Sequence, residues 1–134
     1  MLPLTEKTSS LYRTTLVDET GALVGPSTLS ALTLTLYAYD ANGVLTYLNS
    51  RNAQNVLNQN GVLVYDTLQS GVDENGQPMT YNLAWTMAPA DNAIVNDSKS
   101  VETHYALFQA SWGAGAKGIN HPVALPVKNL ALVS

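Results

Sequence analysis

Apolar and polar residues alternate along much of this sequence, and this alternation limits the fold more than any other feature. In the run LTLTLYAYD, Leu32, Leu34, Leu36 and Ala38 fall on one side of an extended chain, and threonines and tyrosines fall on the other. Successive side chains of a β-strand point to opposite faces, so a period of two is typical of a strand with one buried face. We therefore predict a half-buried strand here.

Similar runs recur along the chain, and turn signals separate them. They occur in LYRTTLVDETGALV near the N-terminus and at residues 44–48, 61–68, 80–87, 101–112 and 121–133. The sequences DETG, DANG, DENGQP and GAGAKG stand between strands, and glycine close to Asp or Asn favours tight turns. Residues 31–48 are accordingly predicted to form a β-hairpin, and no amphipathic helix longer than a turn or two is expected.

Seven to eight short strands with turns at short intervals predict an all-β fold. The 134 residues suffice for one domain with one core, and the pattern favours a single immunoglobulin-like Greek-key β-sandwich. We assign residues 13–134 to this sandwich and residues 1–12 to a loose N-terminal arm. Pro122 and Pro126 place the last strand at a sheet edge, and Pro126 is expected to mark a bulge or a break.

Charged residues are scarce in this chain, which bears on its partners. They make up 12% of the sequence, against roughly 25% in typical soluble domains, so uncharged polar side chains must supply most of the surface. A surface with so little charge favours an assembled protein over a free monomer. The six Lys and Arg residues are spread along the chain rather than clustered, which argues against direct binding to nucleic acid.

Two further observations bear on the class of protein. The sequence has no cysteine, which rules out disulfides, thiolate nucleophiles and cysteine-based zinc sites. No segment approaches the ~18 apolar residues of a membrane span, and the first residues lack the basic region and apolar run of a secretion signal. We therefore expect no membrane partner.

The asparagine-rich segment SRNAQNVLNQNG, residues 50–61, lies between two predicted strands. We interpret it as a short helical turn that plugs one end of the sandwich, with Val56 and Leu57 turned inward. Arg51 is a recognition residue, the partner of a nearby carboxylate or a side chain left in solvent, and an arginine beside a turn is more often one of the last two. A second loop, PADNAIVND, is expected to cover the other end of the core, with Asp91 capping a turn.

Candidate catalytic residues are few. The sequence has no G-x-S-x-G nucleophile motif, and its only histidines are His104 and His121. His104 shares a strand face with Ala106 and Phe108, so we expect a strand-end histidine with one hydrogen bond. A metal site would need a carboxylate such as Glu102 alongside both histidines, and neither DENGQP nor VNDSKS has the spacing of a calcium loop. We therefore predict no enzymatic activity, no metal and no cofactor.

Tyrosines on the polar strand faces suggest a second kind of function. Aromatic rings on the open face of a sandwich can stack on sugar rings, and four residues are candidates for such a platform: Tyr37, Tyr39, Tyr47 and Tyr65. Trp85 and Trp112 share strand faces with Leu83 and Phe108, so both are expected in the core instead. The pattern leaves a carbohydrate-binding or adhesive module open as an alternative function.

Several stretches also resemble a known family. The runs LTLYAYDANGVLTYLNSRNAQNVLNQNGV, LAWTMAPADNAIVND, VETHYALFQASWG and HPVALPVKNLALV are similar to small immunoglobulin-like proteins encoded among the structural genes of tailed bacteriophages. The resemblance covers roughly residues 30–133. None of these runs is a chemical signature, and the matching positions are those that a sandwich needs for its core and turns, so no functional residue is carried over.

The resemblance implies a virion structural or accessory protein at the capsid surface, in the neck between head and tail, or in the tail, with no enzymatic role and no cofactor. The implied partners are other virion proteins and copies of the chain itself in a symmetric assembly. We expect the domain to dock through the N-terminal arm and edge strands. The candidate interaction residues are Leu2, Leu4, Tyr12, Tyr37, Tyr39 and Arg51.

Overall fold

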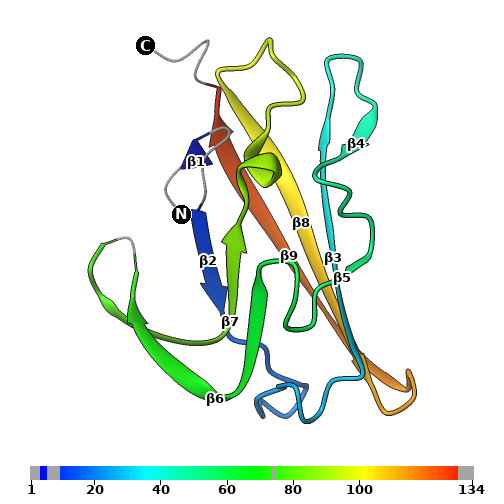
Figure 1. Ribbon diagram of the computed structural model, residues 1–134, viewed down its shortest axis with the longest axis vertical. Helices are drawn as coiled ribbons and strands as arrows, with labels where there is room; N and C mark the ends of the chain where they lie inside the picture. The colour runs from blue at the N-terminus through cyan, green and yellow to red at the C-terminus, as the bar shows by residue number, and fades with distance from the viewer. Residues whose placement is uncertain (1–3, 6–9, 74, 130–134) are drawn as a thin grey trace.

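Two β-sheets lie face to face in the computed structural model, which describes residues 4–5, 10–73 and 75–129 (Figure 1). The larger sheet has the order β1-β9-β8-β3-β4, with β5 also paired to β3, and the smaller sheet has the order β2-β7-β6. The elements are β1 (Leu4–Thr5), β2 (Ser10–Thr14), β3 (Ala31–Tyr39), β4 (Leu45–Tyr47), β5 (Gln54–Asn55), β6 (Val62–Val72), β7 (Pro78–Met87), the 3-10 helix η1 (Pro89–Asn92), β8 (Val101–Trp112) and β9 (Lys117–Lys128).

The order of the strands confirms the predicted immunoglobulin-like Greek key. The chain passes from one sheet to the other after β1, after β2, after β5 and after β7, so that β3 pairs with β8 from much later in the sequence. β1 runs parallel to β9, and the other paired strands are antiparallel. This arrangement of two sheets with crossing connections is the immunoglobulin-like sandwich.

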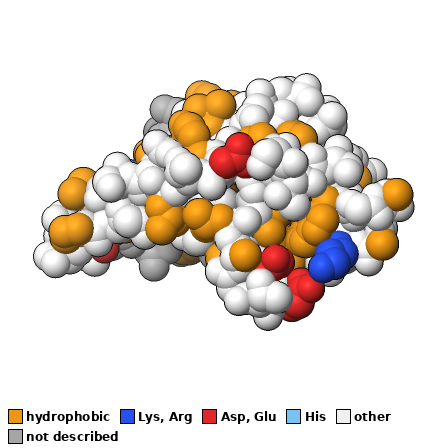
Figure 2. All heavy atoms as spheres, turned by 90° about the horizontal axis from the view of Figure 1, so that it is seen from below, with side chains coloured by type: hydrophobic (Ala, Val, Ile, Leu, Met, Phe, Trp, Pro, Cys, Tyr) orange, Lys and Arg blue, Asp and Glu red, His pale blue; other side chains and the backbone are white. Residues whose placement is uncertain are grey.

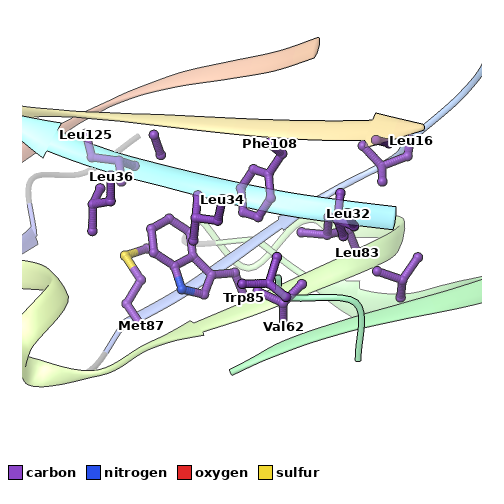
Figure 3. Packing of buried hydrophobic residues seen from close by; sticks show 14 of the residues in the cluster. Leu16, Leu32, Leu34, Leu36, Val62, Leu83, Trp85, Met87, Phe108 and Leu125 are labelled. Atoms are coloured by element: carbon purple, nitrogen blue, oxygen red, sulfur yellow. The ribbon is translucent and has the colours of Figure 1, made fainter. Parts of the chain in front are cut away.

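The core lies between the two sheets and follows the predicted alternation. Leu32, Leu34 and Leu36 of β3 are each 0% exposed, whereas the residues between them are half-buried. Trp85 of β7 meets Phe108 of β8 edge to face, with ring centroids 5.6 Å apart and planes at 81° (Figure 3). Edge-to-face contact is a favoured geometry for aromatic pairs, so this contact joins the two sheets at the centre of the core.

Three turns share one hydrogen-bonding device. Asp40 Oδ1 accepts the N–H groups of Asn42 and Val44 at 2.8 and 2.9 Å, and Gly43 has a positive φ of 76°. In the other two turns, the carboxylates of Asp18 and Asp73 likewise accept the N–H groups of the residues two and four positions further along the chain. Asp side chains of this kind fix the turn, and glycine adopts the positive φ without steric cost, which confirms the predicted turns.

The prediction of a helical plug at residues 50–61 is wrong. Gln54–Asn55 pair with β3 as β5, and the N–H of Val56 donates to the carbonyl of Leu32 at 2.9 Å. Positive φ angles at Ser50, Ala53, Asn58 and Asn60 are incompatible with a helix, and asparagine tolerates this conformation better than most residues. The inward placement of Val56 is confirmed, because this side chain is 0% exposed.

The last strand, β9, begins earlier than predicted, at Lys117, and is more regular, whereas residues 130–133 of the predicted strand lie outside the described residues. β9 pairs with β8 in continuous register from Lys128 opposite Val101 to Lys117 opposite Trp112. Pro126 therefore marks neither a bulge nor a break. The register shift lies instead between β6 and β7, from Val64 to Gln69. Among the described residues, β9 has no strand partner on its other side over residues 117–126, as expected for an edge strand with prolines.

The boundary of the N-terminal arm also needs correction. Residues 10–12 belong to β2, where Ser10 pairs with Met87 and Tyr12 with Trp85, because the alternation of the small sheet begins at residue 10. Leu4 pairs with Val127 in β1. The remainder of the predicted arm, residues 1–3 and 6–9, lies outside the described residues. In the part of the chain that the structure describes, no helix is long and apolar enough to cross a membrane.

Candidate functional site

A buried ion pair joins the loop after β4 to η1. The guanidinium of Arg51 donates to both carboxylate oxygens of Asp91, from Nε to Oδ1 at 2.6 Å and from Nη2 to Oδ2 at 3.0 Å. Arg51 also donates from Nη1 to the Gln54 side chain at 2.8 Å and from Nη2 to the Asn60 carbonyl at 3.1 Å. Of the three alternatives for Arg51, the structure therefore shows the partner of a carboxylate, with only 3% of the residue exposed.

Asp91 holds the η1 loop in place. Its Oδ2 accepts the N–H of Ala88 at 2.8 Å, which confirms the predicted cap, and its Oδ1 also accepts from the Asn49 side chain at 3.0 Å. The Arg51 guanidinium lies 5.7 Å from the centre of the Trp85 ring. A buried carboxylate needs this number of donors, because an unpaired charge in the interior is costly. The cluster therefore fixes both loops at the same end of the sandwich, so the prediction that they cover opposite ends of the core is wrong.

His104 of β8 also belongs to this polar cluster and lies against the η1 loop. Its Nδ1 lies 3.3 Å from the Asp91 carbonyl oxygen and its Nε2 lies 2.6 Å from Glu102 Oε2, so the prediction of a single hydrogen bond is wrong. The Glu102 carboxylate also accepts the N–H groups of Val95 and Asn96. Since His104 is 0% exposed and both of its ring nitrogens are engaged, this cluster ties the surrounding loops together.

The second histidine lies far from the first in the fold. His121 of β9 shares a 2.8 Å hydrogen bond with the hydroxyl of Tyr12 on β2, which closes the open side between the two sheets. Partial burial raises the pKa of the Tyr12 phenol and lowers the pKa of His121. Both shifts favour neutral side chains, and two neutral groups share this hydrogen bond. Within the described residues, no group of three or more His, Asp or Glu side chains is placed to hold a metal ion.

The outer face of the larger sheet carries a cluster of tyrosines. The rings of Tyr37 and Tyr105 stack across β3 and β8 with centroids 5.4 Å apart and planes at 23°. Tyr39 meets both rings edge-on, at 5.9 and 6.0 Å. Tyr47 of β4 pairs with Tyr37 in register. Tyr39 and Tyr47 are each 45% exposed and Tyr105 is 37% exposed, so the cluster presents aromatic surface to solvent.

Three of the four predicted platform tyrosines come together in this way. Tyr65 does not, because it lies on β6 of the smaller sheet, where its ring contacts Tyr81 at 6.5 Å. Tyr105 takes its place, and sequence reasoning missed it as a site residue. The available signal was register: Tyr105 pairs directly with Tyr37, so both side chains point to the same face.

A groove of about 410 Å³ runs beside the tyrosine stack. Its lining residues are apolar or aromatic, and none is charged: Tyr37, Tyr105, Ala106, Leu107, Pro122, Val123 and Ala124. Together with the exposed apolar residues of β4 and β8, this groove forms one surface, which we call the tyrosine face. It consists of the outward side chains of Tyr37, Tyr39, Leu45, Tyr47, Val101, Tyr105, Leu107, Pro122 and Ala124.

The tyrosine face contrasts with the outer face of the smaller sheet. The outward positions of β3, β4, β8 and β9 carry uncharged residues except for Lys128, at the corner opposite Val101. On the smaller sheet, Arg13 lies 5.2 Å from the centre of the Tyr81 ring and donates to the Val72 carbonyl. Charge is also sparse at the end of the molecule seen in Figure 2, where hydrophobic patches lie among uncharged polar groups, a few carboxylates and a Lys or Arg side chain.

A second, more polar cavity of about 270 Å³ lies at the surface beside the Arg51–Asp91 pair. Its lining residues come from the loops around β5 and from β7: Asn49, Arg51, Gln54, Asn60, Gly61, Thr86 and Ala88. The one charged group in this lining, Arg51, is already neutralised by Asp91. The cavity therefore offers hydrogen-bonding groups without net charge.

The predicted interaction residues are dispersed over the fold. Tyr37 and Tyr39 meet on the tyrosine face, whereas Tyr12 is half-buried against His121 and Arg51 lies in the interior. Leu4 is part of β1, and Leu2 lies outside the described residues. Tyr37 and Tyr39 are thus the predicted residues that the structure brings together on an open surface.

The fold and its open tyrosine face define a broad class, a β-sandwich domain of immunoglobulin-like topology. No protein-family model, no curated protein and no solved structure matches the chain. Sandwiches of this class carry many unrelated functions, so the function must be argued from the surface that this chain presents.

Proposed function

We propose that this domain is a non-enzymatic structural or accessory component of a tailed-phage virion, held at the capsid surface, in the neck or in the tail. The observation that carries the proposal is the tyrosine face, where Tyr39, Tyr47 and Tyr105 are exposed beside an uncharged groove. Protein interfaces are enriched in aromatic residues and depleted of charge at their centre. An exposed apolar patch with a polar rim is a typical interaction surface.

The state of the polar interior supports a non-enzymatic role. Catalysis by a general acid or base requires a titratable group within reach of a substrate. In this chain Arg51, Asp91, Glu102 and His104 are buried and bonded to one another or to backbone groups. Their bonds hold the η1 loop and the β4–β5 loop in fixed positions, as a domain that serves as a rigid building block requires.

The location of the uncharged surface favours docking through a sheet face rather than through the edge of β9. Free strand edges can pair with neighbouring chains, but proline at an edge opposes such pairing. Pro122 and Pro126 lie in the stretch of β9 that has no second strand partner among the described residues. The tyrosine face has no such obstacle, so we place the main protein–protein contact of this chain in the assembly there. Docking through the N-terminal arm stays a prediction.

The resemblance of roughly residues 30–133 to small virion proteins of tailed bacteriophages supports a phage particle as the proposed assembly. The proposal is tested by quantitative mass spectrometry of particles purified by density from the source culture. We expect the chain at a constant number of copies per particle, retained through a high-salt wash because the proposed contact is uncharged. The proposal is contradicted if the chain is absent from the particles or if its copy number falls with each successive wash.

A second candidate is a carbohydrate-binding or adhesive module. The observation in its favour is the cluster of Tyr37, Tyr39 and Tyr105, since aromatic rings can stack on sugar rings. Against it, the groove has no carboxylate, amide or guanidinium side chain in its lining to bond sugar hydroxyls. A glycan array separates the candidates. The sugar module is favoured if the wild type binds a glycan and Tyr39→Ala abolishes this binding while it lowers the free energy of unfolding by less than about 1 kcal/mol. No glycan signal removes it.

A further inference from the structure

We infer that the tyrosine face is the surface through which two copies of this chain pack together, sheet against sheet, about a twofold axis. The inference rests on the proposed function, because an assembly component presents the same surface many times. It adds the identity of the partner at that surface. Three properties of the face carry the inference: its charge, its area and its shape.

The first property is charge. The whole chain has a formal net charge of -4, so two copies repel one another if charged surfaces meet. A twofold contact also brings each surface patch against an identical patch, so that any charge near the axis meets its own kind. The tyrosine face contains no charged residue, and Lys128 lies at a corner of the sheet opposite Val101. Self-contact is thus free of like-charge repulsion on this face, unlike on the outer face of the smaller sheet with Arg13.

The second property is area. β8 and β9 are each 12 residues long, which corresponds to roughly 40 Å at ~3.3 Å per residue. The four neighbouring strands lie at ~4.8 Å spacing, but β3 and β4 are only 9 and 3 residues long, so the outer face of the sheet covers about 570 Å². Specific protein interfaces bury from about 600 Å² on each partner. One whole sheet face of this domain is therefore near the lower end of the size that a specific dimer needs, and two such sheets pack in the aligned manner of β-sandwiches.

The third property is shape. The face carries both a projecting and a receiving feature: the ring of Tyr39, 45% exposed, and the groove of about 410 Å³ between Tyr105 and Pro122. A groove of this volume has room for an aromatic side chain. Stacking between Tyr37 and Tyr105 holds one wall of the groove in place, so little side-chain freedom is lost when two copies meet. Rigid tyrosines with a polar tip are well suited to such a contact, because their hydroxyls stay at the rim.

The test is the molecular mass of the purified chain, measured by sedimentation equilibrium over a dilution series from millimolar to micromolar. We expect the wild type to reach twice the 14.3 kDa mass of one chain at high concentration. Two variants of the face, Tyr105→Glu and Tyr39→Arg, place an unpaired charge inside the uncharged contact and are expected to weaken the dimer at least about tenfold. The matched control is Leu63→Glu, at an exposed position on the smaller sheet (50% exposed), which should dimerise as the wild type does.

Each outcome decides the inference. Circular dichroism establishes whether each variant is folded. If Tyr105→Glu does not fold, Tyr39→Arg alone serves as the variant of the tyrosine face. A wild type that stays monomeric over the whole series overturns self-pairing. So does a dimer that both face variants retain, or one that Leu63→Glu abolishes. Particle mass spectrometry tests the proposed function separately. If the chain is a monomer but is present in particles, the proposed function stands and self-pairing is wrong. If the chain dimerises but is absent from particles, self-pairing stands and the proposed function is wrong.

Discussion

Tyr37 of β3 and Tyr105 of β8 stand side by side on the outside of the larger sheet, with ring centroids 5.4 Å apart. The pairing of the two strands sets this contact, since Tyr37 and Tyr105 are directly opposite in register. A stack held by two central strands is rigid, and on this domain it borders an uncharged groove. We therefore regard this pair as the centre of a contact surface.

Breaking the buried ion pair should destabilise the domain strongly. Arg51→Met leaves the Asp91 carboxylate buried without its cation, and we expect a loss of about 3–5 kcal/mol in the free energy of unfolding. Urea denaturation measures this loss. In the double variant with Asp91→Asn, the total loss should fall short of the sum of the single losses by more than about 1 kcal/mol. Lys117→Met, which removes an exposed pair with Glu19, is the control and should show no measurable change.

A buried asparagine should matter as much as a core leucine. Asn82 is 0% exposed, donates to the carbonyl of Val24 at 2.9 Å and accepts the N–H of Leu16 at 2.7 Å. Asn82→Ala leaves both backbone groups without their partner, so we expect a loss of about 2–4 kcal/mol by urea denaturation. Asn120→Ala, at an exposed position of β9, is the matched control. Equal, small effects of the two substitutions would show that the Asn82 contacts contribute little.

One glycine is required for close backbone contact. A Cβ atom added to Gly25 would lie 2.6 Å from the Cα of Asp66 and 2.7 Å from the carbonyl oxygen of Tyr65. Gly25→Ala must therefore move backbone, and we expect a loss of about 1–3 kcal/mol in thermal unfolding. At Gly71 the nearest obstacle is the end of the Arg13 side chain, which can move aside. Gly71→Ala should accordingly cost less, and the reverse order contradicts the packing described.

Stability should fall in mildly acidic solution because of His121. Burial lowers the pKa of this side chain below its ordinary value of 6.5, so the unfolded chain binds a proton that the folded chain does not. The contribution of neutral His121 is fully present above pH 6.5 and is lost as the pH falls through the lower pKa of the folded state. His121→Gln should flatten the pH dependence of urea midpoints between pH 7.5 and 5. An unchanged slope in the variant refutes this assignment.

The strands and the core are predictable from local pattern. Period-two alternation places Leu34, Phe108 and Trp85 inside because a sheet with one buried face imposes that period on the sequence. The DANG and DENG turns are equally readable, since Asp and Gly fit one turn geometry regardless of the rest of the fold. The conformation of the asparagine-rich segment at residues 50–61 is not predictable from the sequence, because it depends on pairing with β3, a tertiary contact with no local signal.

The polar clusters and the tyrosine face are less accessible to sequence reasoning. The pairing of Arg51 with Asp91 depends on two loops that meet only in the folded chain. Alternation along β7 places Asn82 on the outward side, opposite to buried Leu83, and its burial follows from the loop that carries Val24. Tyr37 and Tyr39 are candidates from one strand alone, but the place of Tyr105 beside them requires the β3–β8 pairing that the Greek key provides.

The most direct test of the tyrosine face as a contact surface is tyrosine-specific labelling of the protein in purified particles, compared with the isolated chain at high dilution. We predict that Tyr39 and Tyr47, each 45% exposed in the single chain, are protected several-fold in the particle. Tyr65, on the smaller sheet, serves as the internal reference and should be labelled alike in both samples. Equal labelling of Tyr39 and Tyr47 in particle and isolated chain would contradict the claim that the tyrosine face is the contact surface.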